Sequence, residues 1–401
     1  MTSRALLCIA VCAVGCGGDP APGTSDVDLG STSPDQGPSA DAMAPSGPDG
    51  DVESDATAPS GPDGDVEPDA MAPSGPDGDV EPDATPIRRP HPAGDHDFTL
   101  EMDDAMLGQT VQRTYSVYVP ASYTGDTPTA MILNLHGGRG SAASSKLSSQ
   151  MNIASDAEGY IVVYPEAVED PRWGRRWSNG DRADPNKMGT GEDTRFLGLM
   201  IDALEARLHI DPAQIFVTGI SNGGMMTYRL GCEMSDRIAA IAPVATSRMV
   251  DPCTPSKPIS VIHFHGKADD FIPYEGGPSR DALPLAFRLS DDFLTPTEAI
   301  TPFVSNRACP LDANGDPTTT ILFTVPDPTA DEPHAQCIGY GPCDAQSQAV
   351  LCTMKDGGHT WPGGEHSSQA PRFRALVGPI SPHLNATEMM WEFFQRHPLT
   401  D

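Results

Sequence analysis

The chain has 401 residues and is strongly acidic, with 56 Asp and Glu against 25 Lys and Arg and a formal net charge of −31 at pH 7. This charge argues against a basic face for nucleic acids or anionic membranes, so we expect neither as a direct partner. No apolar run approaches the length of a transmembrane helix.

Residues 1–16 have the pattern of an export signal. Arg4 supplies a positive charge, residues 5–14 are apolar but too few to span a bilayer, and the segment ends in Ala13-Val14-Gly15-Cys16. This ending resembles a bacterial lipobox, in which the cysteine is lipidated. We therefore expect lipidation at Cys16 and an extracellular or cell-surface protein, held as an outer-membrane lipoprotein. Cleavage of an ordinary signal peptide is the alternative.

Residues 17–95 are rich in Pro, Gly, Asp, Ser and Ala, and a 14-residue repeat begins at Asp41, Asp55 and Asp69. Because so few apolar side chains cannot offset the backbone entropy lost on folding, we predict a disordered acidic linker. Its Asp-Gly-Asp spacing also occurs in calcium loops, but the glutamate that ends an EF-hand loop is missing. We expect neither a metal site nor a cofactor.

Residues 96–401 alternate between apolar, β-branched runs and segments with helical spacing. In chain order we expect strands at 113–120, 130–135, 161–164, 215–218, 238–244, 259–264 and 350–354, and helices at 196–208, 224–230 and 387–397. This order predicts one α/β domain with a mostly parallel sheet covered by helices on both faces. Catalytic groups should then follow the carboxyl ends of strands.

A Gly-x-Ser-x-Gly pentapeptide, Gly219 to Gly223, lies between the strand at 215–218 and the helix at 224–230. A serine on such a sharp strand-to-helix turn is the nucleophile elbow of the α/β-hydrolase fold. Ser221 is therefore the candidate nucleophile.

A serine nucleophile needs a histidine base and an acid, which follow it along the chain in the order acid, then histidine. Asp269 is the candidate acid because a predicted strand delivers its loop, and Asp270 is its competitor. His359 is the candidate base because it follows a predicted strand and two glycines.

Three other histidines, His136, His263 and His265, lie at strand ends. We expect them to satisfy backbone groups and not to take part in the chemistry. For the oxyanion we expect two backbone donors, the amides of Asn222 and Gly138.

Six cysteines lie in the folded part, which suggests three disulfides among 15 possible pairings. We favour Cys232–Cys253, which closes a short loop after the elbow helix, together with Cys309–Cys352 and Cys337–Cys343. For substrate binding we expect an aromatic pocket of Trp173, Trp177, Tyr274 and Trp361, although tryptophans buried beneath a polar loop are the alternative.

The chain resembles the polyhydroxybutyrate depolymerase and feruloyl esterase family of extracellular α/β-hydrolases. The resemblance rests on residues 115–120, 133–138, 192–196, 210–212, 217–226, 265–274, 358–363 and 391–398. It implies Ser221 as nucleophile, Asp269 as acid and His359 as base, acting on polymeric or plant-derived esters. It is also consistent with paired cysteines near the elbow helix.

These features together predict a secreted or lipid-anchored, monomeric serine esterase that works through an acyl-enzyme. A serine peptidase of the same fold is one alternative, since amide and ester hydrolysis share the same triad. A surface-displayed, inactive binding domain is the other.

Overall fold

The computed structural model describes residues 91–400 except 106–107, 171–173, 181–191, 282, 284–291, 306–308, 313–316, 342 and 344–346. The expected leader with Cys16, most of the expected linker and Trp173 lie outside the described residues. The described residues belong to one compact unit, Val80–Asp401. None of the helices described is long and apolar enough to cross a bilayer.

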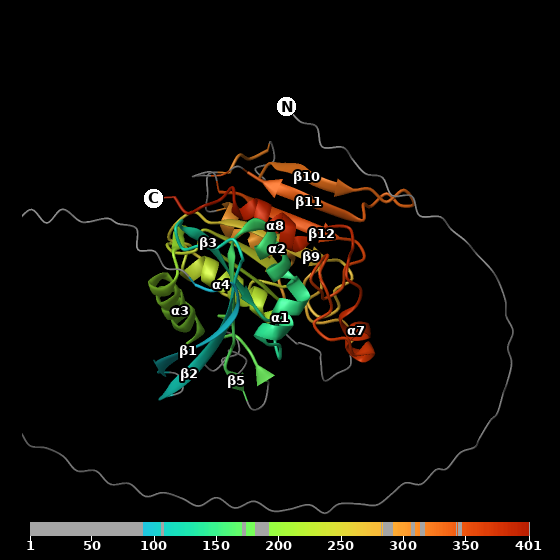
Figure 1. The fold of residues 1–401 in the computed structure, drawn as a ribbon. Helices are drawn as coiled ribbons and strands as arrows, with labels where there is room; N and C mark the ends of the chain where they lie inside the picture. Colours follow the sequence, from blue (N-terminus) through green and yellow to red (C-terminus); the bar gives the residue numbers. More distant parts are fainter. Residues whose placement is uncertain are drawn as a thin grey trace, which may run out of the picture. The chain divides into compact units, whose positions relative to one another are not determined.

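A ten-stranded sheet forms the centre of this unit (Figure 1). The six central strands, β4, β3, β7, β8, β9 and β12, run parallel to one another, and two antiparallel strands complete the sheet at each edge. In spatial order the strands are β1 (Gly94–Asp104), β2 (Gln109–Val119), β4 (Ile161–Pro165), β3 (Thr129–Leu135), β7 (Ile210–Ile220), β8 (Ala240–Val244), β9 (Ser260–Gly266), β12 (Ala349–Met354), β11 (Ala335–Tyr340) and β10 (Thr319–Val325). A separate ribbon pairs β5 (Glu169–Asp170) with β6 (Gly174–Arg175).

Helices cover both faces of the sheet and bury two apolar cores. One core takes residues from α3 (Asp193–Arg207), α4 (Asn222–Glu233), α5 (Pro296–Ile300) and α6 (Pro302–Ser305). The other takes residues from α1 (Ala142–Ser149), α2 (Met151–Glu158) and α8 (Ala386–Phe394). Figure 1 shows α8 beside α2, and α7 (Pro371–Val377) follows the loop that carries His359.

The central strands are buried and mostly apolar because each of their faces meets one of these cores. In β3, Met131 and Leu133 face the first core and Ile132 faces the second. The expected α/β architecture, a mostly parallel sheet with helices on both faces, is confirmed.

Three disulfides join the six cysteines of the folded part. The expected Cys232–Cys253 bond is present and ties the end of α4 to the loop after β8. The other two expected pairings are wrong, because the structure joins Cys309 to Cys343 and Cys337 to Cys352. Cys337 on β11 lies directly opposite Cys352 on β12, with 4.0 Å between the Cα atoms. Strand register therefore decides this pairing, and β11 was not among the expected strands.

A buried histidine fixes the loop that follows β3. The His136 side chain is fully buried, and its Nδ1 donates to the Gly137 carbonyl oxygen at 2.7 Å. Its Nε2 accepts from the Ala167 amide at 3.1 Å, so the ring is neutral with its proton on Nδ1. Burial lowers the pKa of His136 to about 4. The expectation that this histidine satisfies backbone groups is confirmed.

The neutral state of His136 predicts that acid destabilises the fold. The unfolded chain takes up a proton on this ring near pH 6.5, whereas the folded chain does so only near pH 4. The stabilisation is therefore complete above pH 6.5 and decreases as the pH falls toward 4, by about 3 kcal/mol. Urea unfolding between pH 7 and 4.5 should show a weaker pH dependence in His136→Gln than in the parent. Equal slopes in the two proteins would contradict the prediction.

Candidate active site

Ser221 occupies the turn between β7 and α4 with φ 57° and ψ −123°, a backbone conformation that side chains rarely adopt. Three hydrogen bonds hold it there. The Ser221 amide donates to the Val244 carbonyl at 3.0 Å, while its own carbonyl accepts from the Met225 amide at 2.9 Å and from Thr246 Oγ1 at 2.8 Å. The side chain remains partly exposed and can be reached from solvent.

Steric crowding explains the two glycines of the pentapeptide. A Cβ atom on Gly219 would lie 2.7 Å from the Gly223 backbone and 2.8 Å from the Leu135 carbonyl oxygen. A Cβ on Gly223 would lie 2.5 Å from the His136 carbonyl oxygen. The elbow thus packs directly on the end of β3, and no larger residue fits at either position.

Asp269 and His359 form a direct pair. Asp269 is fully buried in the loop after β9, and its Oδ2 accepts from His359 Nδ1 at 2.8 Å. Its Oδ1 accepts from the amides of Phe271 and Ile272, both at 2.9 Å. Because the carboxylate holds the proton on Nδ1, His359 Nε2 is free to accept one.

The competing acid, Asp270, faces away from this pair. Its Oδ1 lies 3.6 Å from Nε of Arg280, and its side chain is partly exposed. The geometry therefore favours Asp269 over Asp270 as the partner of His359.

Close backbone packing brings the loop of His359 over the end of β9. A Cβ on Gly266 would overlap the Gly357 carbonyl oxygen, and a Cβ on Gly358 would overlap that of Val377. The His359 amide donates to the Val377 carbonyl at 2.7 Å, which anchors the loop to the end of α7. Gly266 and Gly358 are thus needed for this approach.

Sheet topology and an apolar cluster place the candidate nucleophile at the same edge of the sheet as the acid and the histidine. Strands β7, β8, β9 and β12 are neighbours and parallel, so their carboxyl ends meet at one edge of the sheet. The Phe271 ring stacks on His359 at 4.9 Å between centroids and packs against a cluster that contains Met225, on the first turn after Ser221. Among the described residues Ser221 Oγ makes no hydrogen bond, and such catalytic contacts often tighten only with substrate bound.

The loop after β3 lies on the elbow and orients one peptide group. A Cβ on Gly138 would lie 3.7 Å from the Cβ of Asn222. The Gly137 carbonyl accepts from His136 Nδ1 and, at 2.9 Å, from the Gly140 amide. Because the same planar peptide carries the Gly138 amide, fixing this carbonyl also fixes the direction of that donor.

The Asn222 side chain is occupied by the backbone of Trp177. Its Oδ1 accepts from the Trp177 amide at 2.7 Å, and its Nδ2 donates to the Trp177 carbonyl at 3.2 Å. These contacts direct the Asn222 side chain toward Trp177, and the backbone amide of Asn222 remains the expected oxyanion donor. Sequence patterns gave no sign of this pairing, nor of the contact that Thr246 makes with Ser221.

Two members of the expected aromatic pocket lie in the core of the described structure. Trp177 is fully buried and donates from Nε1 to the His136 carbonyl at 2.9 Å. Trp361 is 1% exposed and donates to Thr387 Oγ1 at 3.0 Å. Both tryptophans are core residues, which corrects their assignment to substrate binding. Tyr274 is partly exposed, with its ring edge-on to His265 at 5.8 Å.

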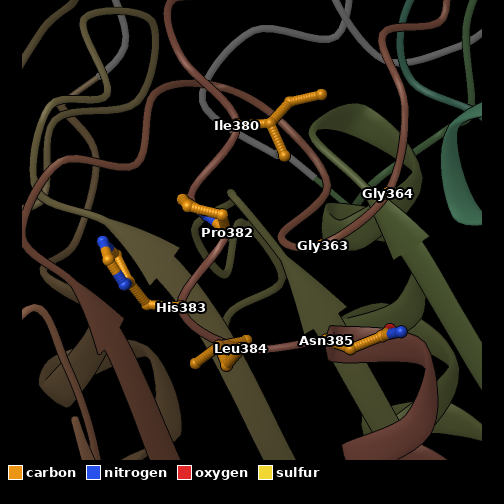
Figure 2. A pocket seen from close by; sticks show the side chains of 7 residues that line it. All are labelled: Gly363, Gly364, Ile380, Pro382, His383, Leu384 and Asn385. Atoms are coloured by element: carbon orange, nitrogen blue, oxygen red, sulfur yellow. The ribbon is translucent and has the colours of Figure 1, made fainter. Parts of the chain in front are cut away.

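An open depression of about 390 Å³ is formed by residues that follow the His359 loop along the chain (Figure 2). It is lined by Gly363, Gly364, Ile380, Pro382, His383, Leu384 and Asn385. None of Ser221, Asp269 and His359 lines it, so this depression is separate from the candidate active site.

The known proteins that resemble this chain are described as esterases. Residues 113–250 match the family described as "Esterase PHB depolymerase". Feruloyl esterase B of Piromyces equi is 26% identical over 254 residues, which cover 62% of this chain and 42% of that protein. The putative esterase NocK of Nocardia uniformis is 28% identical over 327 residues, which cover 77% of this chain and 86% of that protein.

Among solved structures, an acetyl xylan esterase from Aspergillus awamori aligns with a TM-score of 0.43 at 15% identity, covering 70% of this chain and 98% of its own. The chain thus spans less than half of the Piromyces relative and most of the Nocardia one. The family match over residues 113–250 and these relatives support the expected resemblance to the polyhydroxybutyrate depolymerase and feruloyl esterase family of α/β-hydrolases.

Proposed function

We propose that this chain is a serine esterase that hydrolyses carboxylic esters from polymeric or plant-derived material through an acyl-enzyme. The observation that carries the proposal is the Asp269–His359 hydrogen bond at the sheet edge where the elbow presents Ser221. The names of its relatives, a feruloyl esterase and a putative esterase, support the substrate class.

In the proposed reaction Ser221 Oγ attacks the ester carbonyl and passes its proton to His359 Nε2. Asp269 keeps the imidazole in the required tautomer and stabilises its charged form. The amides of Asn222 and Gly138 stabilise the oxyanion. Collapse of the tetrahedral intermediate breaks the C–O bond while His359 protonates the departing alcohol. Water, deprotonated by His359, then attacks the acyl-enzyme and releases the acid.

The nucleophile is tested by Ser221→Ala in the full chain, with methyl ferulate, short-chain nitrophenyl esters and suspended polyhydroxybutyrate as substrates. We expect ester turnover that falls about 10⁴-fold or more in the variant, because the attacking atom is lost. Labelling by a fluorophosphonate probe should disappear with it.

The matched control is Ser155→Ala on α2. It removes a buried hydroxyl that donates to the Tyr160 carbonyl, and it should retain activity. Turnover that survives in Ser221→Ala would refute the assignment. Turnover of aminopeptidase substrates alone would indicate a peptidase, and a parent protein that neither turns over ester nor reacts with the probe would indicate a binding domain.

The choice of acid is tested by a matched pair of substitutions. Asp269→Asn should reduce kcat about 10⁴-fold, because the NH2 group that replaces Oδ2 would donate to His359 Nδ1 and so move the ring proton to Nε2, the wrong tautomer for a base. Asp270→Asn should change kcat by less than about threefold, since Asp270 faces Arg280. A larger loss in the second variant than in the first would reverse the assignment.

We further propose that residues 1–16 direct export and that Cys16 carries a lipid anchor, with the acidic linker joining the anchor to the catalytic domain. The supporting observation is the sequence Ala13-Val14-Gly15-Cys16 after an apolar run.

The anchor is tested by metabolic labelling of the full chain in a bacterial host with an alkyne fatty acid. We expect label on the parent and on Cys12→Ala, which alters a cysteine inside the signal, but none on Cys16→Ala. Label that persists in Cys16→Ala would rule out this residue as the anchor.

A further inference from the structure

A line of buried polar side chains connects the helix of the nucleophile to the loop of the acid. Tyr228 lies on α4, two turns after Ser221, and His263 and His265 lie on β9. All three side chains are fully buried. Tyr228 Oη lies 2.6 Å from His263 Nδ1, His263 Nε2 lies 3.0 Å from His265 Nδ1, and His265 Nε2 lies 2.8 Å from the Ile272 carbonyl oxygen.

The proton positions along this line follow from its last contact. The Ile272 carbonyl can only accept, so His265 must carry its proton on Nε2. A neutral His265 then accepts at Nδ1, which requires His263 to donate from Nε2. His263 in turn accepts at Nδ1, so the Tyr228 hydroxyl donates. Burial lowers the pKa of both histidines, which agrees with two neutral rings.

The line ends on the loop that holds the candidate acid. The Ile272 carbonyl accepts from His265, while the Ile272 amide donates to Asp269 Oδ1 at 2.9 Å. The same histidine nitrogen lies 3.6 Å from Asp269 Oδ2, the atom that binds His359. His265 therefore fixes the backbone that cradles the carboxylate, and its ring lies beside the carboxylate itself.

We propose that Tyr228, His263 and His265 are positioning residues that set Asp269 against His359 relative to the helix of the nucleophile. The proposal rests on the proposed serine-hydrolase function of Ser221, Asp269 and His359. Hydrogen bonds suit this task because they are directional, whereas apolar packing at the same place would leave the rotation of the carboxylate unfixed. None of the three residues touches the substrate in this scheme.

The first test is Tyr228→Phe in the full chain, which removes only the terminal donor. We expect kcat per active site to fall about 10- to 100-fold with KM nearly unchanged, because the acid loses its alignment and not its charge. Active sites are counted by titration with a fluorophosphonate probe. The matched control is Tyr160→Phe, another fully buried tyrosine, whose hydroxyl has no hydrogen-bond partner among the described residues. Its kcat should stay within about twofold of the parent.

Equal losses in the two variants, or no loss in Tyr228→Phe, would overturn the positioning role while leaving the proposed function in place. A parent protein without ester turnover or probe labelling would instead refute the proposed function itself.

The second test reads the proton positions by NMR of the full chain labelled with ¹⁵N-histidine. His263 and His265 should both be neutral and protonated on Nε2 at pH 7. The NMR signals of each ring are assigned by their disappearance when that histidine alone is substituted. Charged rings, or a proton on Nδ1 of His265, would overturn the proposal. His265→Gln, which keeps an N–H near the original Nε2, should retain at least about tenfold more kcat than His265→Leu; equal activities would count against it.

Discussion

The site depends on how closely the elbow packs against the end of β3. The Leu135 and His136 carbonyl oxygens occupy the space that side chains at 219 and 223 would need, so both positions must be glycine. This contact in turn forces the loop after β3 to lie on the elbow. A single steric constraint therefore places the nucleophile and one predicted oxyanion donor, Gly138, side by side.

Buried polar contacts then orient what the packing brings together. Three neutral histidines, His136, His263 and His265, each use both ring nitrogens, and each contact is with a backbone group, another imidazole or the Tyr228 hydroxyl. In a dry interior such a network is costly when a partner is lost, so it specifies one arrangement of the loops. Its members being neutral, it adds no buried charge that would need a counterion.

The candidate triad was predictable from sequence because each part has a local sign. The pentapeptide follows an apolar strand, Asp269 follows another, and His359 follows Gly358, which the close backbone packing requires. The edges of the sheet were missed. β1 alternates acidic and apolar residues and so does not resemble a buried strand, and β10, an apolar run that exposes Ile321 and Leu322, was not among the expected strands. Because β11 was not expected, the strand register that places Cys337 opposite Cys352 could not be predicted either. The burial of Trp177 depends on distant backbone partners, and residue type alone does not reveal it.

The nucleophile helix is held from two different parts of the chain. At its start, Asn222 binds the backbone of Trp177. The amide of Ser178, which follows Trp177, donates to Asp193, and Asp193 in turn pairs with buried Arg113 at 2.6 Å. Two turns later, Tyr228 begins the line of hydrogen bonds that ends at the acid loop. Hydrophobic burial is not directional and would tolerate small rotations of α4, whereas these contacts would not. A hydrolase gains from this because donors that already point at the reacting atoms need no rearrangement when charge develops.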